Sequence, residues 1–299
     1  MKGKKVMKKR VFMSCVAALV STQVMLAGEV KEEEKPAAPA AKSGSATAGK
    51  SLKTPRVTDV APGPGLRVKQ VNKDYEGTGV HHALYLPTDW VKGKKYPVIV
   101  EFPAAEWRGH LDGKVESCNL GYGISGGNGA IWVCIPCVDN EAKQNALKGY
   151  GDVVATVDYC KATVARICAE FGGDASNVFL VGYGRGAAAC NRIGLNDDAI
   201  AALWRGFVCG KNYDGGWSFK ASKEDVAGRL KRLGSRPQFI CAASVEGTRN
   251  QLKELCPTGN FTFLDIPNED NSDKWVLEES QQQADIRKWF QGALKREEK

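Results

Sequence analysis

Hydrophobic and polar positions alternate in blocks from residue 57 onward, and these blocks predict strands and helices in turn. Short apolar runs with turn-forming residues at their rims indicate strands at 66–71, 81–87, 96–103, 130–136, 177–182, 204–210, 236–244 and 261–267. Segments with apolar residues at helical spacing indicate helices at 152–172, 185–194, 223–234, 246–256 and 279–298. The first two strands predict an antiparallel start. The later alternation predicts a mostly parallel sheet of about eight strands with helices on both faces, in a single α/β domain over 57–299.

The first 28 residues lack this alternation and have the pattern of a secretory signal peptide. Six basic residues within the first ten precede an apolar stretch, and Ala27 and Gly28 are small enough for a cleavage position. Glu29 stands where an acylated lipoprotein would need Cys. We therefore expect residues 1–28 to be removed and the protein to be exported, to the periplasm or outside the cell. An uncleaved anchor helix is the alternative, and the protein would then meet a membrane only through it.

Residues 29–56 are rich in Ala, Lys, Glu, Pro, Ser and Gly and lack aromatic residues, so they predict a disordered linker. Within it, 44–51 match the P-loop pattern Gly-x4-Gly-Lys-Ser. No predicted strand precedes this match and no helix follows it, and we interpret it as chance. The formal net charge of +8 falls to about +2 without the signal. Such a charge gives no electrostatic basis for binding nucleic acid.

Nine cysteines remain after the signal, and several lie in apolar runs where cysteine packs as a small hydrophobe. Cys134 and Cys137 have the spacing of a redox pair, but they end an apolar strand, whereas such pairs work at a helix N-terminus. We interpret the cysteines as structural and leave open one or two disulfides. The three histidines and the scattered acidic residues show no metal-ligand spacing, so we expect no metal and no cofactor.

The stretch "VFLVGYGRGAAAC", residues 178–190, predicts a strand, a sharp turn and a helix. In an α/β sheet, chemistry takes place at such carboxyl-terminal strand ends. A turn this tight needs small neighbours, which Gly182 and Gly186 supply. The alanines that follow let the helix approach the sheet. The stretch has the form of a nucleophile elbow, with Gly184 where the nucleophilic serine would stand.

The chain from about residue 75 to about 295 resembles secreted bacterial esterase-like and depolymerase-like α/β hydrolases. The elbow stretch, "CNLGYGISGG" at 118–127 and "DKWVL" at 273–277 carry this resemblance. It implies an α/β-hydrolase fold and a catalytic triad in which an acid and then a histidine follow the nucleophile.

Carried over residue by residue, the resemblance implies a degenerate triad. Gly184 takes the nucleophile position and Asn271 the histidine position. The acid position falls on Glu246, with Asp214 as a weaker candidate. Every histidine of the chain lies upstream of Gly184. Loss of a triad nucleophile alone costs about 10⁶-fold in turnover in a well-studied protease, so we expect no serine-type catalysis.

Substitute nucleophiles fit poorly. Ser125 also lies in a Gly-x-Ser-x-Gly pattern, but that pattern precedes a strand, and we expect 123–127 to form a glycine-rich loop at the pocket rim. Cys190 lies within the helix after the elbow and should pack against the sheet. His81 and His82 occupy an early strand and should point to opposite sides of it.

We expect the backbone groups of the site to be retained although the catalytic side chains are absent. The N–H of Arg185 and those of Ala104 and Ala105 could still form an oxyanion pocket, with His110 and Trp275 lining the cleft. Trp107 and Trp217 are further candidates for an aromatic wall, although packing explains them as well. The sequence thus favours an exported, inactive hydrolase-fold protein that binds a small molecule, glycan or polyester fragment. An active ester hydrolase or depolymerase with a non-standard site and a structural envelope or interaction protein are the alternatives.

Overall fold

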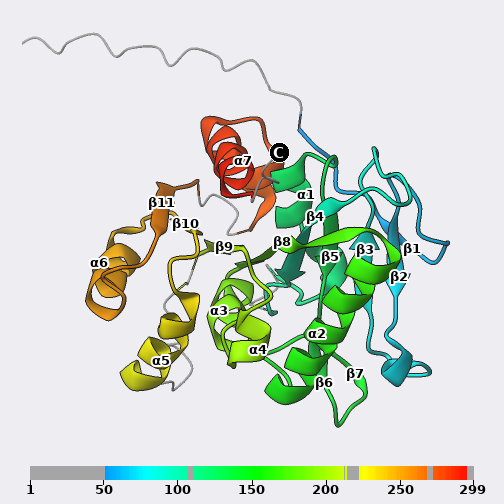
Figure 1. Ribbon diagram of the computed structural model, residues 1–299, viewed down its shortest axis with the longest axis horizontal. Coiled ribbons are helices and arrows are strands. Elements are labelled where there is room, and N and C mark those ends of the chain that lie inside the picture. The colour runs from blue at the N-terminus through cyan, green and yellow to red at the C-terminus, as the bar shows by residue number, and fades with distance from the viewer. Residues whose placement is uncertain (1–50, 107–110, 212, 214–221, 268–271, 295–299) are drawn as a thin grey trace, which may run out of the picture. The chain divides into compact units, whose positions relative to one another are not determined.

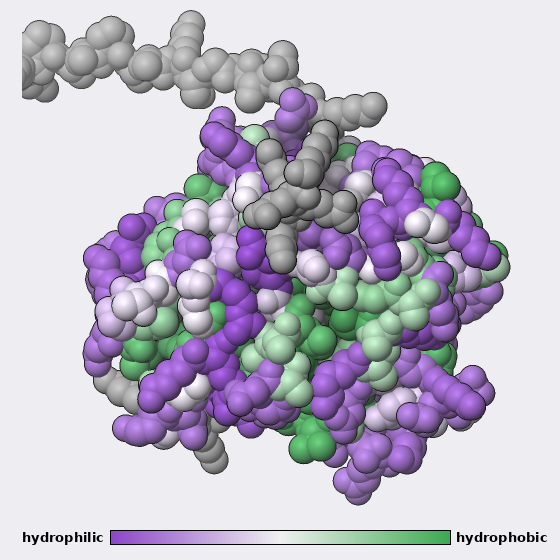
Figure 2. Space-filling view, in the orientation of Figure 1, coloured by the Kyte–Doolittle hydropathy of each residue, from purple (hydrophilic) through white to green (hydrophobic). Residues whose placement is uncertain are grey.

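The computed structural model describes residues 51–106, 111–211, 213, 222–267 and 272–294. The predicted signal peptide, most of the predicted linker and all but the last residue of the P-loop-like match lie outside these residues. Within them, no helix combines the length and the hydrophobicity needed to cross a membrane. The space-filling view shows hydrophilic residues around the periphery of this face and hydrophobic residues nearer its middle (Figure 2).

A nine-stranded sheet forms the centre of the described domain (Figure 1). In spatial order its strands are β1 (Val57–Thr58), β2 (Arg67–Gln70), β3 (His82–Tyr85), β5 (Ile131–Cys134), β4 (Tyr96–Phe102), β8 (Gly173–Tyr183), β9 (Gly206–Gly210), β10 (Gln238–Ala242) and β11 (Phe261–Asp265). Only β3 pairs antiparallel to its neighbours, β2 and β5, and all the other pairs are parallel. The predicted sheet, with its antiparallel start, is confirmed, and the additional strand is the two-residue β1.

Helices cover both faces of this sheet, as predicted (Figure 1). One face packs against α2 (Val153–Glu170), α3 (Arg185–Arg192), α4 (Asp198–Ala201), α5 (Lys223–Leu233) and α6 (Glu246–Leu255). The other packs against α1 (Leu120–Ser125), the 3-10 helix η4 (Lys274–Leu277) and α7 (Gln281–Ala293). Side chains stabilise several helix starts: Asp152, Ser222 and Ser280 each accept a hydrogen bond from a backbone N–H in the first turn.

Strand β4 shows why its sequence is an almost unbroken apolar run. Successive side chains of a strand point to opposite faces, and both faces of this sheet are covered. Val98, Val100 and Phe102 therefore enter the core beneath α2 and α3. Ile99 enters the core beneath α1 and α7. Glu101 points to that second face too, and it is a buried carboxylate in a central strand.

Besides β1 and the 3-10 helices, three parts of the fold were not predicted. Residues 123–127 were expected to form a glycine-rich loop, but 123–125 are the last part of helix α1 (Leu120–Ser125), because two of its glycines fit against the core. A Cβ on Gly121 would lie 2.0 Å from Trp132, and one on Gly123 would lie 2.4 Å from Val276. The hairpin of β6 (Cys137–Asp139) and β7 (Gln144–Ala146) and the one-turn helix α4 are the others.

The domain begins earlier than predicted, because residues 51–54 lie against it. The backbone N–H of Leu52 donates to the carbonyl of Leu277 at 2.8 Å. The hydroxyl of Ser51 donates to Glu278, and the hydroxyl of Thr54 donates to the side-chain oxygen of Asn119 at 2.8 Å. The boundary of the predicted linker at residue 56 is therefore corrected, since these contacts hold its last residues on the domain.

The nine cysteines of the described residues carry free thiols, and seven of them are buried. Cys134 ends β5 and Cys137 begins β6, so this pair sits at a strand end, as predicted, and not at a helix start. Cys190 is buried in α3, where its thiol donates to the carbonyl of Gly186. The cysteines thus contribute mainly to the packing of the two cores.

The two adjacent histidines point to opposite sides, as predicted. His81 Nε2 lies 2.8 Å from Glu116 Oε1. His82 is buried, with Nδ1 2.7 Å from the hydroxyl of Tyr159. Burial, together with the positive charge of Arg166, lowers the pKa of His82 to about 3.

We expect His82 to make the protein sensitive to acid. Below pH ~6.5 the unfolded chain protonates this imidazole while the folded chain does not, so the contribution of His82 to the free energy of unfolding falls as the pH falls. This contribution should fall by about 2 kcal/mol between pH 7 and pH 5, and urea unfolding measures it as the difference in pH dependence between the parent and His82→Phe, since all other titrating groups are common to both proteins. His82→Phe should lower stability at pH 7 but remove this part of the pH dependence. His81→Gln is the control, because Glu116 raises the pKa of His81 and its effect has the opposite sign. An unchanged pH dependence in His82→Phe would contradict the prediction.

Candidate functional site

The turn between β8 and α3 has the geometry predicted for a nucleophile elbow. Gly184 links the strand to the helix with φ 56° and ψ −120°. A Cβ on Gly182 would lie 2.3 Å from the backbone of Gly186, and a Cβ on Gly186 would lie 2.3 Å from the carbonyl oxygen of Phe102. Real Cβ atoms do not approach so closely, so glycine is required at both flanking positions.

Gly184 itself is different, because space for a side chain exists there. A Cβ would lie 3.8 Å from Ala104 Cβ and 3.8 Å from Leu111 Cδ1, which are ordinary van der Waals distances. The positive φ is the constraint, since side chains with a Cβ rarely adopt it. A serine would thus fit sterically, but at the cost of backbone strain.

A cavity of about 440 Å³ opens beside the elbow, and we call it the elbow cleft. It lies at the carboxyl ends of β4 and β8, where α/β proteins place their ligand sites. Its lining is predominantly polar: Glu101, Asp112, Lys114, Ser117, Cys118, Asn119, Tyr183, Ser272, Asp273 and Lys274, with Ala104 and Leu111. Because Ala104 and Leu111 also face the missing Cβ of Gly184, the elbow and the cleft belong to one site.

Two buried carboxyl groups meet the cleft at the start of α1. Glu101 accepts hydrogen bonds from the backbone N–H groups of Leu120 and Gly121 and from the indole of Trp132. Asp273 accepts from both the backbone and the side-chain nitrogen of Asn119. These donors replace the hydrogen bonds to water that the carboxyl oxygens lose when they are buried.

Their environment favours the protonated forms of both carboxyl groups. Burial, and then the negative charge of Asp273, raise the pKa of Glu101 to about 7. Burial raises the pKa of Asp273 to about 6, against the hydrogen bonds from Asn119. Both carboxyl groups therefore titrate closer to neutral pH than an exposed carboxyl group does.

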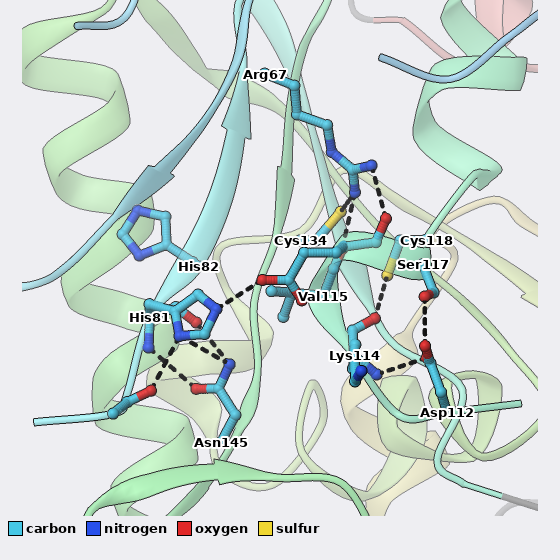
Figure 3. A network of polar contacts seen from close by, with 12 residues as sticks. Arg67, His81, His82, Asp112, Lys114, Val115, Ser117, Cys118, Cys134 and Asn145 are labelled. Atoms are coloured by element: carbon cyan, nitrogen blue, oxygen red, sulfur yellow. Dashed lines mark hydrogen bonds and ion pairs between the residues drawn. The ribbon is translucent and has the colours of Figure 1, made fainter. Parts of the chain in front are cut away.

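The segment 112–119 forms one wall of the cleft, and contacts from β2 and β3 hold it (Figure 3). Arg67 donates to the carbonyls of Val115 and Glu116 and to the sulfur of Cys134. Its guanidinium also stacks over Trp132, 4.1 Å from the ring centroid. The ion pair of His81 with Glu116 joins the outer side of this wall to the residue that precedes β3.

The structure brings only part of the predicted site to the cleft. Ala104 lines it, Ala105 is buried beside it, and Arg185 begins α3 directly after the elbow. Trp275 is buried in the core with α1 and α7 and is not among the lining residues. Glu246 begins α6 with a largely exposed side chain, 3.7 Å from Arg249, and does not line the cleft either.

Several other candidates lie outside the described residues, namely Asn271, His110, Asp214, Trp107 and Trp217. The assignments of Asn271 and Glu246 as former triad positions therefore stay predictions. Ser125 ends α1, where its hydroxyl donates to the carbonyls of Gly121 and Tyr122, and it does not line the cleft.

Glu101 and Asp273 were missed in the sequence. A signal existed for Glu101, because it is the one charged residue in an otherwise apolar strand run, and buried charges demand partners. Asp273 lies in the motif "DKWVL", but nothing in the sequence indicates that it meets Asn119, which is 154 positions away.

Structural comparison relates the chain to hydrolases at low sequence identity. A candidate dipeptidyl aminopeptidase IV from Bacteroides ovatus matches with a TM-score of 0.52 and 15% identity, over 76% of this chain and 35% of that one. The AtxE2 isopeptidase matches with a TM-score of 0.48 and 12% identity, over 76% and 43%. A thermophilic esterase from Thermogutta terrifontis matches with 0.48 and 15%, over 77% and 96%. The chain thus spans less than half the length of the first two.

The chain has the α/β-hydrolase fold. The Bacteroides match supports this, together with the mostly parallel sheet, its helices on both faces and the elbow after the central strand β8. No family model matches the sequence, and no curated protein matches it. At such low identity the likeness concerns the fold alone.

We expect Gly184→Ser to lower the free energy of unfolding by about 1–3 kcal/mol, because serine must adopt the strained backbone of the elbow. Denaturant unfolding at neutral pH measures this. Gly228→Ser is the matched control, because Gly228 lies in α5 with open space around its Cβ position and no positive φ. The control should be neutral or slightly stabilising. A Gly184→Ser protein as stable as the parent would show that the elbow carries no strain.

Proposed function

We propose that this protein binds a hydroxyl-rich small ligand, such as a short glycan, in the elbow cleft and does not perform serine–histidine hydrolysis. The proposal rests on Gly184. The elbow turn opens onto the polar cleft, and the residue at the nucleophile position of this turn has no side chain. Export through residues 1–28 belongs to the same proposal and rests on the sequence pattern.

The positions of the histidines, one of which would have to act as general base, support the absence of serine-type catalysis. All three histidines precede Gly184 in the chain. His81 is engaged with Glu116, and His82 is buried against Tyr159. Neither of these lines the elbow cleft. A serine-type mechanism needs a base within hydrogen-bond reach of the nucleophile, and the described residues offer no histidine for it.

The chemistry of the cleft favours a glycan over a polyester fragment. Carboxyl groups of Glu101 and Asp273 and the amide of Asn119 can pair with hydroxyl groups, and Lys114 and Lys274 add donors. Ala104 and Leu111 are the fully apolar side chains of the lining, so most of the groups that could orient a ligand in the cleft are polar. A volume of about 440 Å³ lies within the ordinary range of small-molecule sites.

One observation favours a second candidate, a hydrolase with a non-standard site. Glu101 and Asp273 combine raised pKa values, of about 7 and about 6, with access to the cleft. Paired carboxyl groups whose pKa values lie near the working pH are suited to general acid and base roles. In this alternative the bond to be hydrolysed would lie between these two groups, and Gly184 would only shape the wall.

We expect no turnover of p-nitrophenyl butyrate and no labelling by a fluorophosphonate probe above a heat-inactivated control. Gly184→Ser combined with Asn271→His should gain measurable esterase activity if the oxyanion pocket persists, because it restores the nucleophile and the predicted base. Labelling of the parent protein would refute the loss of serine-type catalysis. Turnover without labelling that Glu101→Gln abolishes would establish the second candidate.

We expect xylotriose or cellotriose to bind with micromolar to millimolar affinity in isothermal titration calorimetry, and a 3-hydroxybutyrate trimer to bind more weakly. Ala104→Trp should weaken glycan binding at least tenfold by filling the cleft. Ala199→Trp is the matched control, because Ala199 is exposed in α4 and does not line the cleft. Tighter binding of the ester trimer, or equal binding by Ala104→Trp, would contradict the assignment.

A further inference from the structure

Against the expectation of no metal drawn from the sequence, we propose that Glu101, Cys118 and Cys134 bind a thiophilic divalent cation, most suitably Zn²⁺, in the inner wall of the elbow cleft. The carboxylate and the two sulfur atoms lie within 4.8 Å of one another. Glu101 lies in β4 and Cys134 ends β5, whereas Cys118 lies two residues before the start of α1. All three residues are at least nine-tenths buried, with exposed fractions of 1%, 3% and 0%.

The donor set selects the kind of ion. Two thiolates and one carboxylate suit Zn²⁺, whereas Mg²⁺ and Ca²⁺ prefer oxygen ligands alone. Around Zn²⁺, with bonds of about 2.0–2.3 Å, tetrahedral ligand atoms lie roughly 3.3–3.8 Å apart. The upper bound of 4.8 Å on the cluster exceeds that spacing by about 1.0–1.5 Å, a difference that side-chain rotations can close.

The surroundings of Glu101 orient it as a ligand. Its Oε2 already accepts hydrogen bonds from Gly121 at 2.9 Å and from the indole of Trp132 at 2.8 Å. Its Oε1 accepts one bond, from Leu120 at 3.2 Å, and an ionised carboxylate oxygen has a further lone pair. Hydrogen bonds of this kind around a ligating group fix its direction toward the metal.

Arg67 balances the charge of the loaded site. Its Nη2 lies 3.2 Å from Cys134 Sγ. On binding, the two thiols release their protons to the solvent and form two metal–sulfur bonds. The divalent ion, two thiolates, one carboxylate and one guanidinium then sum to zero, so the loaded site buries no net charge. The same guanidinium also fixes the segment 112–119 through Val115 and Glu116, and so positions Cys118.

The site would be open on one side. Glu101 and Cys118 line the elbow cleft, whereas Cys134 lies behind them at the end of β5. Three protein ligands leave one position of a tetrahedral ion vacant, and that position would face the cleft. A water molecule or a hydroxyl group of the ligand could occupy it. Because Glu101 would be a ligand of the ion, the loaded cleft would pair with hydroxyl groups through Asp273, Asn119 and the vacant position of the ion.

The experiment uses the full-length protein reduced with a phosphine, stripped of metal by chelator and then titrated with Co²⁺. We expect one equivalent to bind, with a thiolate-to-cobalt charge-transfer band in the near ultraviolet and the intense visible bands of tetrahedral cobalt. Zn²⁺ should displace Co²⁺ and bleach both. This readout needs no variant, so it does not depend on whether substituted proteins fold.

Variants then assign the ligands. Cys118→Ser, Cys134→Ser and Glu101→Gln should each weaken Co²⁺ binding at least tenfold, and the two serine variants should lose charge-transfer intensity. Cys160→Ser is the matched control, since Cys160 is equally buried but packs in α2 on the other face of the sheet, and it should bind as the parent does.

Three results would overturn the proposal. One is the absence of the charge-transfer band at stoichiometric Co²⁺. Another is unchanged binding in Cys118→Ser and Cys134→Ser, which would place the ion elsewhere. The last is a Cys118–Cys134 disulfide in peptides of protein prepared with excess zinc and no reductant, which would make the pair a structural crosslink. None of these outcomes bears on the esterase assays, so the two proposals fail separately.

Discussion

The close approach of α3 to β4 and β8 determines the shape of the site. At Gly182 and Gly186 the backbones come so near that a single Cβ would overlap a neighbouring main-chain atom. The turn between them therefore keeps its form whatever side chain Gly184 carries or lacks. A protein built on this contact can lose the nucleophile and still retain the elbow, the start of α3 and the cleft beside it. The backbone geometry of the elbow therefore does not depend on a nucleophilic side chain at Gly184.

A second constraint is the burial of Glu101 beneath α1. Its carboxyl group joins β4 to β5 through Trp132 and to the first turn of α1 through two backbone N–H groups. Asn119 continues the connection to Asp273. Removing one partner from such a network leaves another buried polar group unsatisfied, so its members depend on one another. The polar wall of the cleft is for this reason part of the core and not a surface loop.

Local sequence was sufficient for most of the fold. The strand runs at 96–103 and 130–136 and the helical spacing over 152–172 correspond to β4, β5 and α2, with no boundary shifted by more than two residues. Helix α1 was missed because its glycines are poor helix formers, and what holds them is the packing against Trp132 and Val276, which is a tertiary effect.

The candidate site was only half visible in the sequence. Gly184 could be placed from the elbow pattern and Ala104 from the end of the strand run at 96–103, since both patterns are local. The grouping of Glu101 with Cys118, Cys134 and Asp273 depends on contacts between segments far apart in the chain. No periodicity or spacing within one segment encodes such a meeting. The same is true of the segment 51–54, whose composition resembles the linker before it and whose partners come from the other end of the domain.

That short segment has a mechanical consequence. A pull on Ser51 enters the described domain through the bonds of Ser51, Leu52 and Thr54. Thr54 transmits it to Asn119, and Asn119 holds Asp273 in the wall of the cleft. The segment 51–54 and the wall of the elbow cleft are therefore mechanically connected through Asn119. Tension along the N-terminal segment would load the cleft before it loaded the sheet.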